Sequence, residues 1–140
     1  MSTDFNFIET PNTTSKVIDT ITLTTNDYLS FPTFFAEKHG LKKMGDNLYA
    51  RLFFDKGKSA IAIQFVTEKA PGLYKVNVSP EYGATCKIKS FLLNNDIDTK
   101  KHADKYEYKK YQSSSLGMNG SDVYVIILGT KISGGGENVI

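Results

Sequence analysis

The stretch SFPTFFAEKHGLKKMGDNLYARLFFDKGKSAIAIQFV, residues 30–66, carries the pattern that decides the fold of this chain. Two runs in its second half, residues 48–55 and 60–66, alternate apolar and other side chains, as half-buried β-strands do. A short connection that contains Gly57 separates the two runs. This spacing is typical of a β-hairpin, so the stretch predicts a hairpin at its C-terminal end.

A short helix is predicted ahead of the hairpin, over residues 34–39. Phe34 and Phe35 give this helix an apolar face, and Gly40 stands where a residue of left-handed conformation ends helices. A helix of this length is only marginally stable in isolation. Its apolar face must therefore pack against the rest of the domain.

Shorter apolar or alternating runs predict the remaining elements: strands at residues 17–24, 73–79, 84–88, 106–111 and 123–128, and a second short helix at 90–94. Residues 1–16 are polar and lack a period, which predicts a flexible N-terminal arm. Residues 131–140 include three consecutive glycines and are predicted to be a flexible C-terminal tail. Residues 17–130 are predicted to form a single domain.

The pattern of residues 17–66 returns in residues 73–128. When the two segments are aligned, Phe34 falls on Phe91 and Lys43 falls on Lys100. With an insertion in the second hairpin loop, residues 61, 63 and 65 fall on residues 124, 126 and 128. Each half reads strand, helix, strand, strand. We therefore expect a compact, barrel-like, mainly β domain of the α+β class, in which two pseudo-symmetric halves share one core.

The order of Phe31-Pro32, the short helix ending at Gly40, the Gly45-Asp46 turn and the hairpin resembles the SpoVT/AbrB swapped-hairpin domain. The resemblance covers about residues 20–66 reasonably and residues 82–128 poorly. Members of this family include transition-state regulators and MazE-like antitoxins, and they are typically DNA-binding homodimers that exchange hairpins. The resemblance implies two such units fused in tandem and a function as a DNA-binding regulator or accessory protein.

Composition places few limits on the partner. The chain has 140 residues, with 17 basic and 15 acidic residues and a net charge of +2, so a basic surface requires an uneven distribution of charge. Cys86 is the only cysteine, which excludes an internal disulfide and fits a reducing compartment. The chain shows no export signal and no apolar run long enough to cross a membrane, so we expect a soluble cytoplasmic protein.

Basic residues in the helix-flanking segments of the two halves are the candidates for DNA contacts. Lysines can neutralise phosphates, whereas base reading favours arginine, asparagine and glutamine, and Arg51 is the only arginine. We therefore expect recognition of the backbone of duplex DNA. The expected contact residues are Lys42, Lys43, Arg51, Lys87, Lys89, Lys100 and Lys101. The plain alternative is that these residues form an ordinary solvated surface.

Two other functions remain open. The chain could be a protein-binding module, such as an inhibitor or assembly factor, that uses the edge at residues 106–111 or the outer aromatic side of residues 48–55. Alternatively, Tyr106, Tyr108 and Tyr111, which alternate with lysines, could stack the bases of single-stranded nucleic acid.

Catalysis is not indicated by any motif. His39 and His102 lack the ligand spacing of a metal site, and Cys86 has no histidine close in sequence. Gly134-Gly135-Gly136 is not followed by the Lys-Ser/Thr of a phosphate-binding loop. We therefore expect no enzyme activity, no metal and no cofactor.

Overall fold

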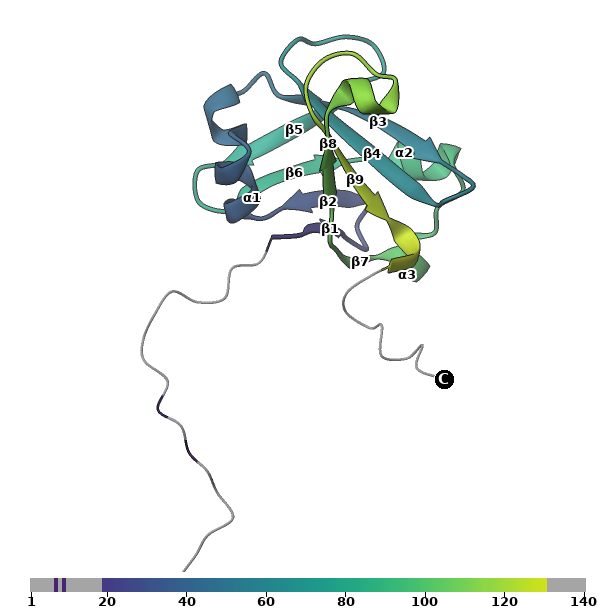
Figure 1. Cartoon of the computed structure of the whole chain (residues 1–140), viewed down its shortest axis with the longest axis horizontal. Coiled ribbons are helices and arrows are strands. Elements are labelled where there is room, and N and C mark those ends of the chain that lie inside the picture. The colour runs from purple at the N-terminus through teal and green to yellow at the C-terminus, as the bar shows by residue number, and fades with distance from the viewer. Residues whose placement is uncertain (1–6, 8, 10–18, 131–140) are drawn as a thin grey trace, which may run out of the picture.

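The computed structural model describes residues 7, 9 and 19–130. The predicted tail, residues 131–140, and the predicted arm, residues 1–16, lie outside the described residues, except for residues 7 and 9. Within the described residues, nine strands form one antiparallel sheet in the order β7-β1-β2-β6-β5-β3-β4-β9-β8, which curls into a half-barrel (Figure 1). The strands are β1 (Ile21–Leu23), β2 (Tyr28–Phe31), β3 (Tyr49–Asp55), β4 (Ala60–Val66), β5 (Tyr74–Ser79), β6 (Gly83–Lys87), β7 (Asp104–Tyr106), β8 (Lys109–Tyr111) and β9 (Val123–Ile127).

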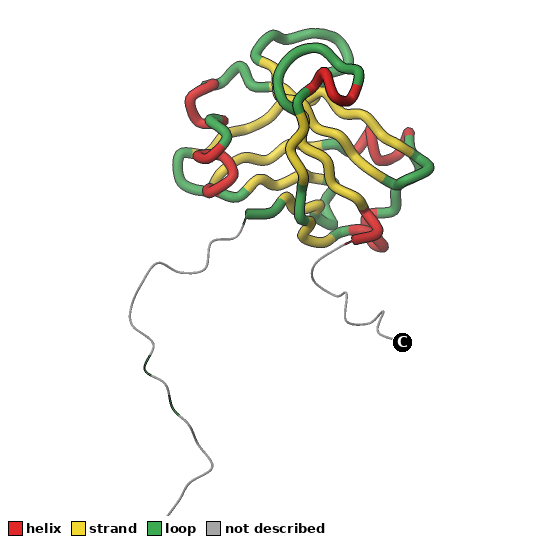
Figure 2. The backbone as a smooth tube through the Cα atoms, viewed as in Figure 1, coloured by secondary structure: helices red, strands yellow, loops and turns green. Residues whose placement is uncertain are grey.

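Helices are short and lie at the margins of the strands (Figure 2). The described chain has three α-helices and three 3₁₀ turns: α1 (Thr33–Lys38), α2 (Lys89–Asn94), α3 (Thr99–His102), η1 (Leu41–Met44), η2 (Ser113–Leu116) and η3 (Leu128–Thr130). The prediction of a mainly β fold is confirmed. The predicted hairpin is also confirmed, because β3 and β4 pair along their full length from Tyr49↔Val66 to Asp55↔Ala60.

The curled sheet has two layers, which we call layer 1 (β7, β1, β2, β6 and β5) and layer 2 (β3, β4, β9 and β8). Layer 2 lies nearer the viewer in Figure 1, with layer 1 behind it. β3 and β5 join the layers through two pairs, Tyr49↔Lys75 and Ala50↔Tyr74. At the two ends of the strand order, β7 pairs with β1 and β8 pairs with β9. The continuous segment of residues 104–111 therefore contains both end strands of the sheet.

The prediction of a single strand at residues 106–111 is wrong, because this segment belongs to two strands, β7 and β8, which are separated by Glu107 and Tyr108. Tyr106 ends β7 and is fully buried, and its hydroxyl donates to the carbonyl of Leu128 at 3.2 Å and to that of His102. The chain leaves layer 1 and enters layer 2 at this point, so it cannot keep one set of strand partners.

The core lies between the layers, and α1 and α2 lie at opposite sides of the molecule in Figure 1. Gly40 has φ +74°, which confirms that a left-handed residue ends the first helix. The two phenylalanines of α1 differ in burial: Phe35 is fully buried, whereas Phe34 is 38% exposed. The ammonium of Lys38 lies 5.6 Å from the Phe34 ring. Only one of the two phenylalanines on the predicted apolar face therefore belongs to the core.

Candidate nucleic-acid interface

A row of polar side chains crosses the outward face of layer 1. Thr22 on β1 pairs with Lys105 of β7 on one side and with Ser30 of β2 on the other. Ser30 in turn pairs with Thr85 of β6, and Thr85 pairs with Asn77 of β5. Residues directly opposite each other on neighbouring strands have closely spaced side chains on the same face. These five residues, which we call the polar row, are therefore contiguous although they come from five strands.

The outward direction of the polar row follows from strand alternation. Ile21 and Leu23, the neighbours of Thr22, are fully buried, and so are Leu29 and Phe31 on either side of Ser30. Successive side chains of a strand point to opposite faces, so the polar row faces away from the core. Consistent with this, the side chains of Lys105, Thr85 and Asn77 are exposed, and those of Thr22 and Ser30 are half-buried.

Further lysines lie on the same outward face. Lys87 is two residues beyond Thr85 on β6 and pairs with Tyr28. Lys75 is two residues before Asn77 on β5, and its ammonium lies 4.9 Å from the Tyr49 ring. The outward positions of the five described strands of layer 1 thus include three lysines and no carboxylate. This face has a positive character that the overall charge of the chain does not reveal.

Four of the seven predicted DNA-contact residues lie on or beside layer 1. Lys87 is on the outward face itself, and Lys89 begins α2 immediately after β6. Lys100 and Lys101 belong to α3, which leads into β7 at the edge of the layer. All four side chains are exposed.

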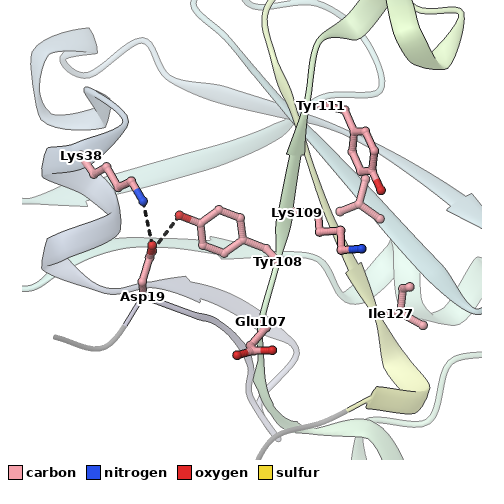
Figure 3. Close-up of a pocket in the computed structure, with 8 residues that line it drawn as sticks. Asp19, Lys38, Glu107, Tyr108, Lys109, Tyr111 and Ile127 are labelled. Carbon is pink, nitrogen blue, oxygen red and sulfur yellow. Dashed lines mark hydrogen bonds and ion pairs between the residues drawn. The ribbon is translucent and has the colours of Figure 1, made fainter. Parts of the chain in front are cut away.

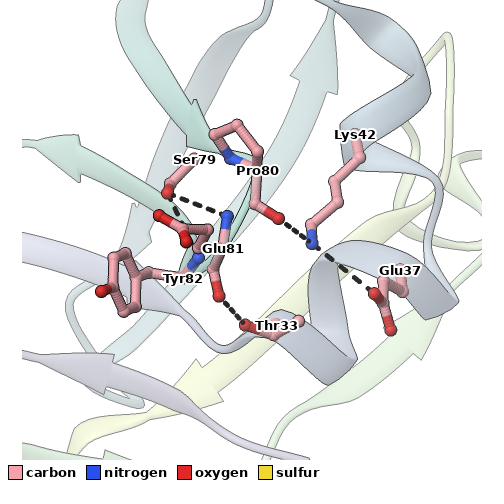
Figure 4. Close-up of polar contacts among 7 residues, drawn as sticks. All are labelled: Thr33, Glu37, Lys42, Ser79, Pro80, Glu81 and Tyr82. Carbon is pink, nitrogen blue, oxygen red and sulfur yellow. Dashed lines mark hydrogen bonds and ion pairs between the residues drawn. The ribbon is translucent and has the colours of Figure 1, made fainter.

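The other three predicted residues lie elsewhere. Lys42 donates to the carbonyl of Pro80 at 3.0 Å and lies 3.5 Å from the Glu37 carboxylate, so its ammonium is engaged within the molecule (Figure 4). Lys43 follows it in η1 and is exposed. Arg51 is in layer 2, where its guanidinium lies 5.2 Å from the Phe53 ring.

The lysine pairs that follow the first and second helices are not brought together. Lys42 and Lys43 follow α1, whereas Lys100 and Lys101 lie in α3, at the opposite side of the molecule in Figure 1. The positive residues that the structure does bring together are those of the outward face of layer 1. Sequence reasoning did not include Lys75 and Lys105 among the DNA-contact residues. The place of Lys75 in the alternating run 73–79 was a usable signal, whereas Lys105 lies just before the predicted strand at 106–111.

Contacts between α1 and the β5–β6 turn fix one end of layer 1. Thr33 donates its hydroxyl to the carbonyl of Glu81 at 3.3 Å, beside the contact of Lys42 with Pro80 (Figure 4). The Ser79 hydroxyl accepts the backbone N–H groups of Glu81 and Tyr82, each at 3.2 Å. These bonds hold the turn against the helix and set the position of β5 and β6.

A second polar cluster joins residues that are far apart in sequence. The Asp19 carboxylate accepts from the Tyr108 hydroxyl at 2.7 Å and from the Lys38 ammonium at 2.9 Å (Figure 3). The Nε2 atom of His39 lies 2.7 Å from the same Tyr108 hydroxyl. Asp19, Lys38 and Tyr108 also line a cavity of about 600 Å³. The sequence singled out His39 and Tyr108 separately but contained no sign that they meet.

Protonation states in this cluster follow from its surroundings. Burial raises the pKa of Asp19, but the hydrogen bonds from Tyr108 and Lys38 outweigh it and hold this pKa below its usual value. Burial and the bond to Asp19 raise the pKa of Tyr108. The single proton of the Tyr108 hydroxyl goes to Asp19, so His39 must donate its Nε2 proton to the Tyr108 oxygen. A phenol held protonated in this way is a poor nucleophile, and the cluster is better suited to fixing Asp19 against α1.

We expect His39 to make folding sensitive to pH. Burial first, and then the charges of Lys110 and Lys38, lower the pKa of His39 from its usual 6.5. The unfolded chain therefore binds this proton more readily than the folded chain. The contribution of neutral His39 to folding stability should be fully present above pH 6.5. It should decline as the pH falls from 6.5 through the lowered pKa of His39 in the folded protein. Urea unfolding of the wild type and His39→Gln, compared across this interval, checks the prediction. An imidazole that titrates by NMR at or above the usual value would contradict it.

The remaining candidate groups show no reactive setting. Burial raises the pKa of Cys86 to about 12, so its thiol stays protonated. No group of three or more His, Cys, Asp or Glu residues among the described residues could hold a metal ion. Tyr106 is fully buried and Tyr108 is bonded to Asp19, so the predicted tyrosine stack for unpaired bases is not formed.

The outward face of layer 2 differs in character from that of layer 1. Phe53, Ala62 and Val125 are cross-strand neighbours on β3, β4 and β9. With Leu116 and Ile127, which are 38% and 40% exposed, they line a cavity of about 450 Å³. One outward face of the molecule is therefore polar and basic, and the other is largely apolar.

Comparison of the chain with protein-family models, curated proteins and solved structures finds no match. No helix in the described part of the chain has the length and apolar character that crossing a membrane requires.

Proposed function

We propose that this protein binds nucleic acid, most naturally duplex DNA, through the outward face of layer 1. The observation that carries the proposal is the polar row, in which Thr22, Ser30, Thr85 and Asn77 lie side by side with Lys105 at one end and Lys87 nearby. Hydroxyl and amide side chains donate hydrogen bonds to phosphate oxygens, and lysines that neutralise phosphates release counterions.

Recognition through this face would concern the backbone of the nucleic acid. Its long cationic side chains are lysines, whereas the arginine of the chain, Arg51, lies in layer 2. Bidentate contacts to guanine, the commonest base-specific contacts, favour arginine. The proposed activity is therefore that of a regulator or accessory protein with weak sequence preference, in which Lys87, Lys89, Lys100, Lys101 and Lys105 supply the positive charge.

We also propose that the domain consists of two fused, pseudo-symmetric halves of the SpoVT/AbrB type. This fold would be a second argument for nucleic-acid binding. The strand pairing supports this. In the first half the four strands are β1, β2, β3 and β4; in the second they are β5, β6, the broken strand β7–β8, and β9. The first strand of each half pairs with the third strand of the other half: β1 pairs with β7, and β5 pairs with β3. The second strands, β2 and β6, pair with each other, and so do the fourth strands, β4 and β9.

The ladder registers agree with the aligned sequence along the fourth strands and differ from it by one residue along the third. Phe53 pairs with Ala62, whose aligned counterpart Val125 pairs with Lys109, one residue before Lys110, on which Phe53 falls in the alignment. The same correspondence places Ile61 on Tyr124, as the sequence alignment does, and both side chains are buried. Members of the resembled family bind DNA, which makes a nucleic-acid ligand the natural first test.

Titration of fluorescently labelled duplex DNA at several salt concentrations tests the proposal. We expect affinity to fall steeply with salt. Lys87→Glu/Lys105→Glu should weaken binding and lower the slope by about 0.9 for each phosphate that the protein no longer neutralises. Lys56→Glu/Lys58→Glu is the matched control, because it makes the same charge change at the tip of the β3–β4 hairpin in layer 2. It should affect binding much less.

Two results would count against the proposal. Equal losses in the two double variants would indicate a general charge effect rather than a binding face. Absence of binding to duplex DNA at low salt would favour the protein-binding alternative, for which the apolar outward face of layer 2 is the relevant observation.

A further inference from the structure

Strand β3 has an open edge along most of its length. On one side it pairs with β4 through all seven of its residues. On the other side, among the described strands, it pairs with β5 only at Tyr49 and Ala50, because β5 begins at Tyr74 and β3 extends beyond it (Figure 1). The edge from Arg51 to Asp55 therefore keeps backbone groups that no described strand takes up. A long, regular and largely apolar edge is a template for pairing with another chain.

The direction of the backbone groups identifies which residues would pair. The Leu48 carbonyl accepts from the Val76 N–H at 3.0 Å, so it points toward the β5 side of β3. Backbone groups alternate in direction along a strand. The N–H and C=O groups of Leu52 and Phe54 therefore point out of the open edge.

Side-chain burial along β3 changes where its pairing with β5 ends. Leu48 and Ala50 face the core and are fully buried. Leu52 and Phe54 face the same side but remain only half-buried, although the centroid of the Phe91 ring of α2 lies 6.2 Å from that of the Phe54 ring. Apolar area at the open edge is thus left incompletely covered, and an added strand would bury more of it.

The edge at the β8 end of the strand order is, by contrast, protected. β8 has only three residues, and Lys109 and Lys110 are both exposed. Short edge strands and lysines are the usual devices that prevent edge-to-edge pairing. The open part of β3, Arg51-Leu52-Phe53-Phe54-Asp55, contains neither lysine nor proline. The open edge of β3 and the edge of β8 therefore differ in their capacity to associate.

We propose that β3 pairs in antiparallel fashion with β3 of a second copy of this chain, centred on Phe53. In this register Arg51 of each copy lies opposite Asp55 of the other, so the charges of the edge are self-complementary. Leu52 of each copy lies opposite Phe54 of the other, and these two residues exchange both of their N–H···O=C bonds. The two Phe53 side chains meet on the two-fold axis. Such a contact is isologous and closes as a dimer.

The present contacts of the two charged side chains permit this arrangement. Arg51 uses one guanidinium nitrogen to donate to the Gln64 side chain at 3.2 Å, which leaves further N–H donors. Asp55 accepts the Lys58 backbone N–H on one carboxylate oxygen at 3.1 Å, which leaves the other oxygen. Both side chains are exposed, so they can reorient at little cost.

Sedimentation equilibrium of the full chain over a range of concentrations tests the pairing. We expect a monomer–dimer equilibrium for the wild type. Arg51→Asp places two carboxylates opposite each other, and Asp55→Arg places two guanidinium groups opposite each other. Each single variant should therefore raise the dimer dissociation constant by about tenfold or more. Far-ultraviolet circular dichroism and thermal unfolding establish that each variant is folded.

Two complementation experiments make the test specific to this register. The double variant Arg51→Asp/Asp55→Arg restores opposite charges and should recover dimerisation. An equimolar mixture of Arg51→Asp and Asp55→Arg should form a heterodimer, because every facing pair in it is oppositely charged.

Three outcomes would overturn the proposal: a wild type that stays monomeric at the highest soluble concentration, a dimer that neither single variant weakens, or a double variant that fails to dimerise while remaining folded. A wild type that stays monomeric would indicate that the edge of β3 binds an extended segment of another protein. A dimer that neither single variant weakens would indicate that self-association uses another surface. Failure of DNA binding has no bearing on these outcomes, since the edge lies outside the proposed DNA-binding face.

Discussion

Replacing Gly83 with alanine should cost roughly 2–6 kcal/mol of folding free energy, a large fraction of the about 5–15 kcal/mol that stabilises an ordinary domain. Gly83 begins β6 with φ +94°, a conformation that residues with a side chain rarely adopt. A Cβ atom there would lie 2.2 Å from the carbonyl oxygen of Phe31 and 2.8 Å from the carbonyl carbon of Pro32. Both are backbone atoms of the turn from β2 into α1, so they cannot move independently of the strand and the helix.

Gly117→Ala is the matched control for this prediction. Gly117 has φ +71°, but no heavy atom lies within 4 Å of the place where its Cβ would be. We expect a loss of about 1–2 kcal/mol, which is the cost of the left-handed conformation alone. Urea unfolding followed by circular dichroism measures both variants. Equal losses would mean that β6 does not approach the β2–α1 turn as closely as the structure indicates.

The second large effect is expected at Phe35, where substitution by alanine should cost about 3–5 kcal/mol. Phe35 is fully buried in α1, and its ring centroid lies 5.1 Å from that of Tyr124, 4.9 Å from that of Tyr108 and 5.2 Å from that of Phe31. Its removal would leave a cavity where both layers and the helix meet. The loss should appear as a lower midpoint of urea unfolding.

The adjacent Phe34→Ala provides a control with the same chemical change on the same helix. Phe34 is 38% exposed and packs near the Lys38 ammonium, so we expect its removal to cost about 1 kcal/mol or less. Similar losses for the two variants would contradict the orientation of α1, because rotation of the helix would bury the two phenylalanines to similar extents. A much larger loss for Phe34→Ala than for Phe35→Ala would contradict it outright.

The two phenylalanines also mark how far local sequence reasoning reaches. The Phe34-Phe35 pair and Gly40 predicted a short helix and its end, because helix termination depends on the conformation of a single residue. Which phenylalanine enters the core depends on how the helix axis sits on the sheet. That orientation is set by distant contacts, such as Thr33 with Glu81 and Lys42 with Pro80, which local spacing does not contain.

The candidate DNA-binding face illustrates the same limit at a larger scale. Lys87 and its neighbours were predicted to contact DNA, but the residues that would accompany them come from five strands spread between Thr22 and Lys105. Each strand was visible as an alternating run. The side on which each run faces outward, and the register that places Ser30 beside Thr85, are properties of the paired sheet. A shift of one residue in register would reverse the faces.

The amino-acid sequence by itself determined the mainly β class, the β3–β4 hairpin and the end of α1 at Gly40, because period-two alternation, turn residues and left-handed glycines act within a few neighbouring residues. Only the tertiary structure decided that the polar row is continuous, that Asp19 meets Tyr108, and that β3 keeps an open edge. These features require segments far apart in the chain to pair or to diverge. Such arrangements are fixed by the shared core, whose packing depends on all strands together.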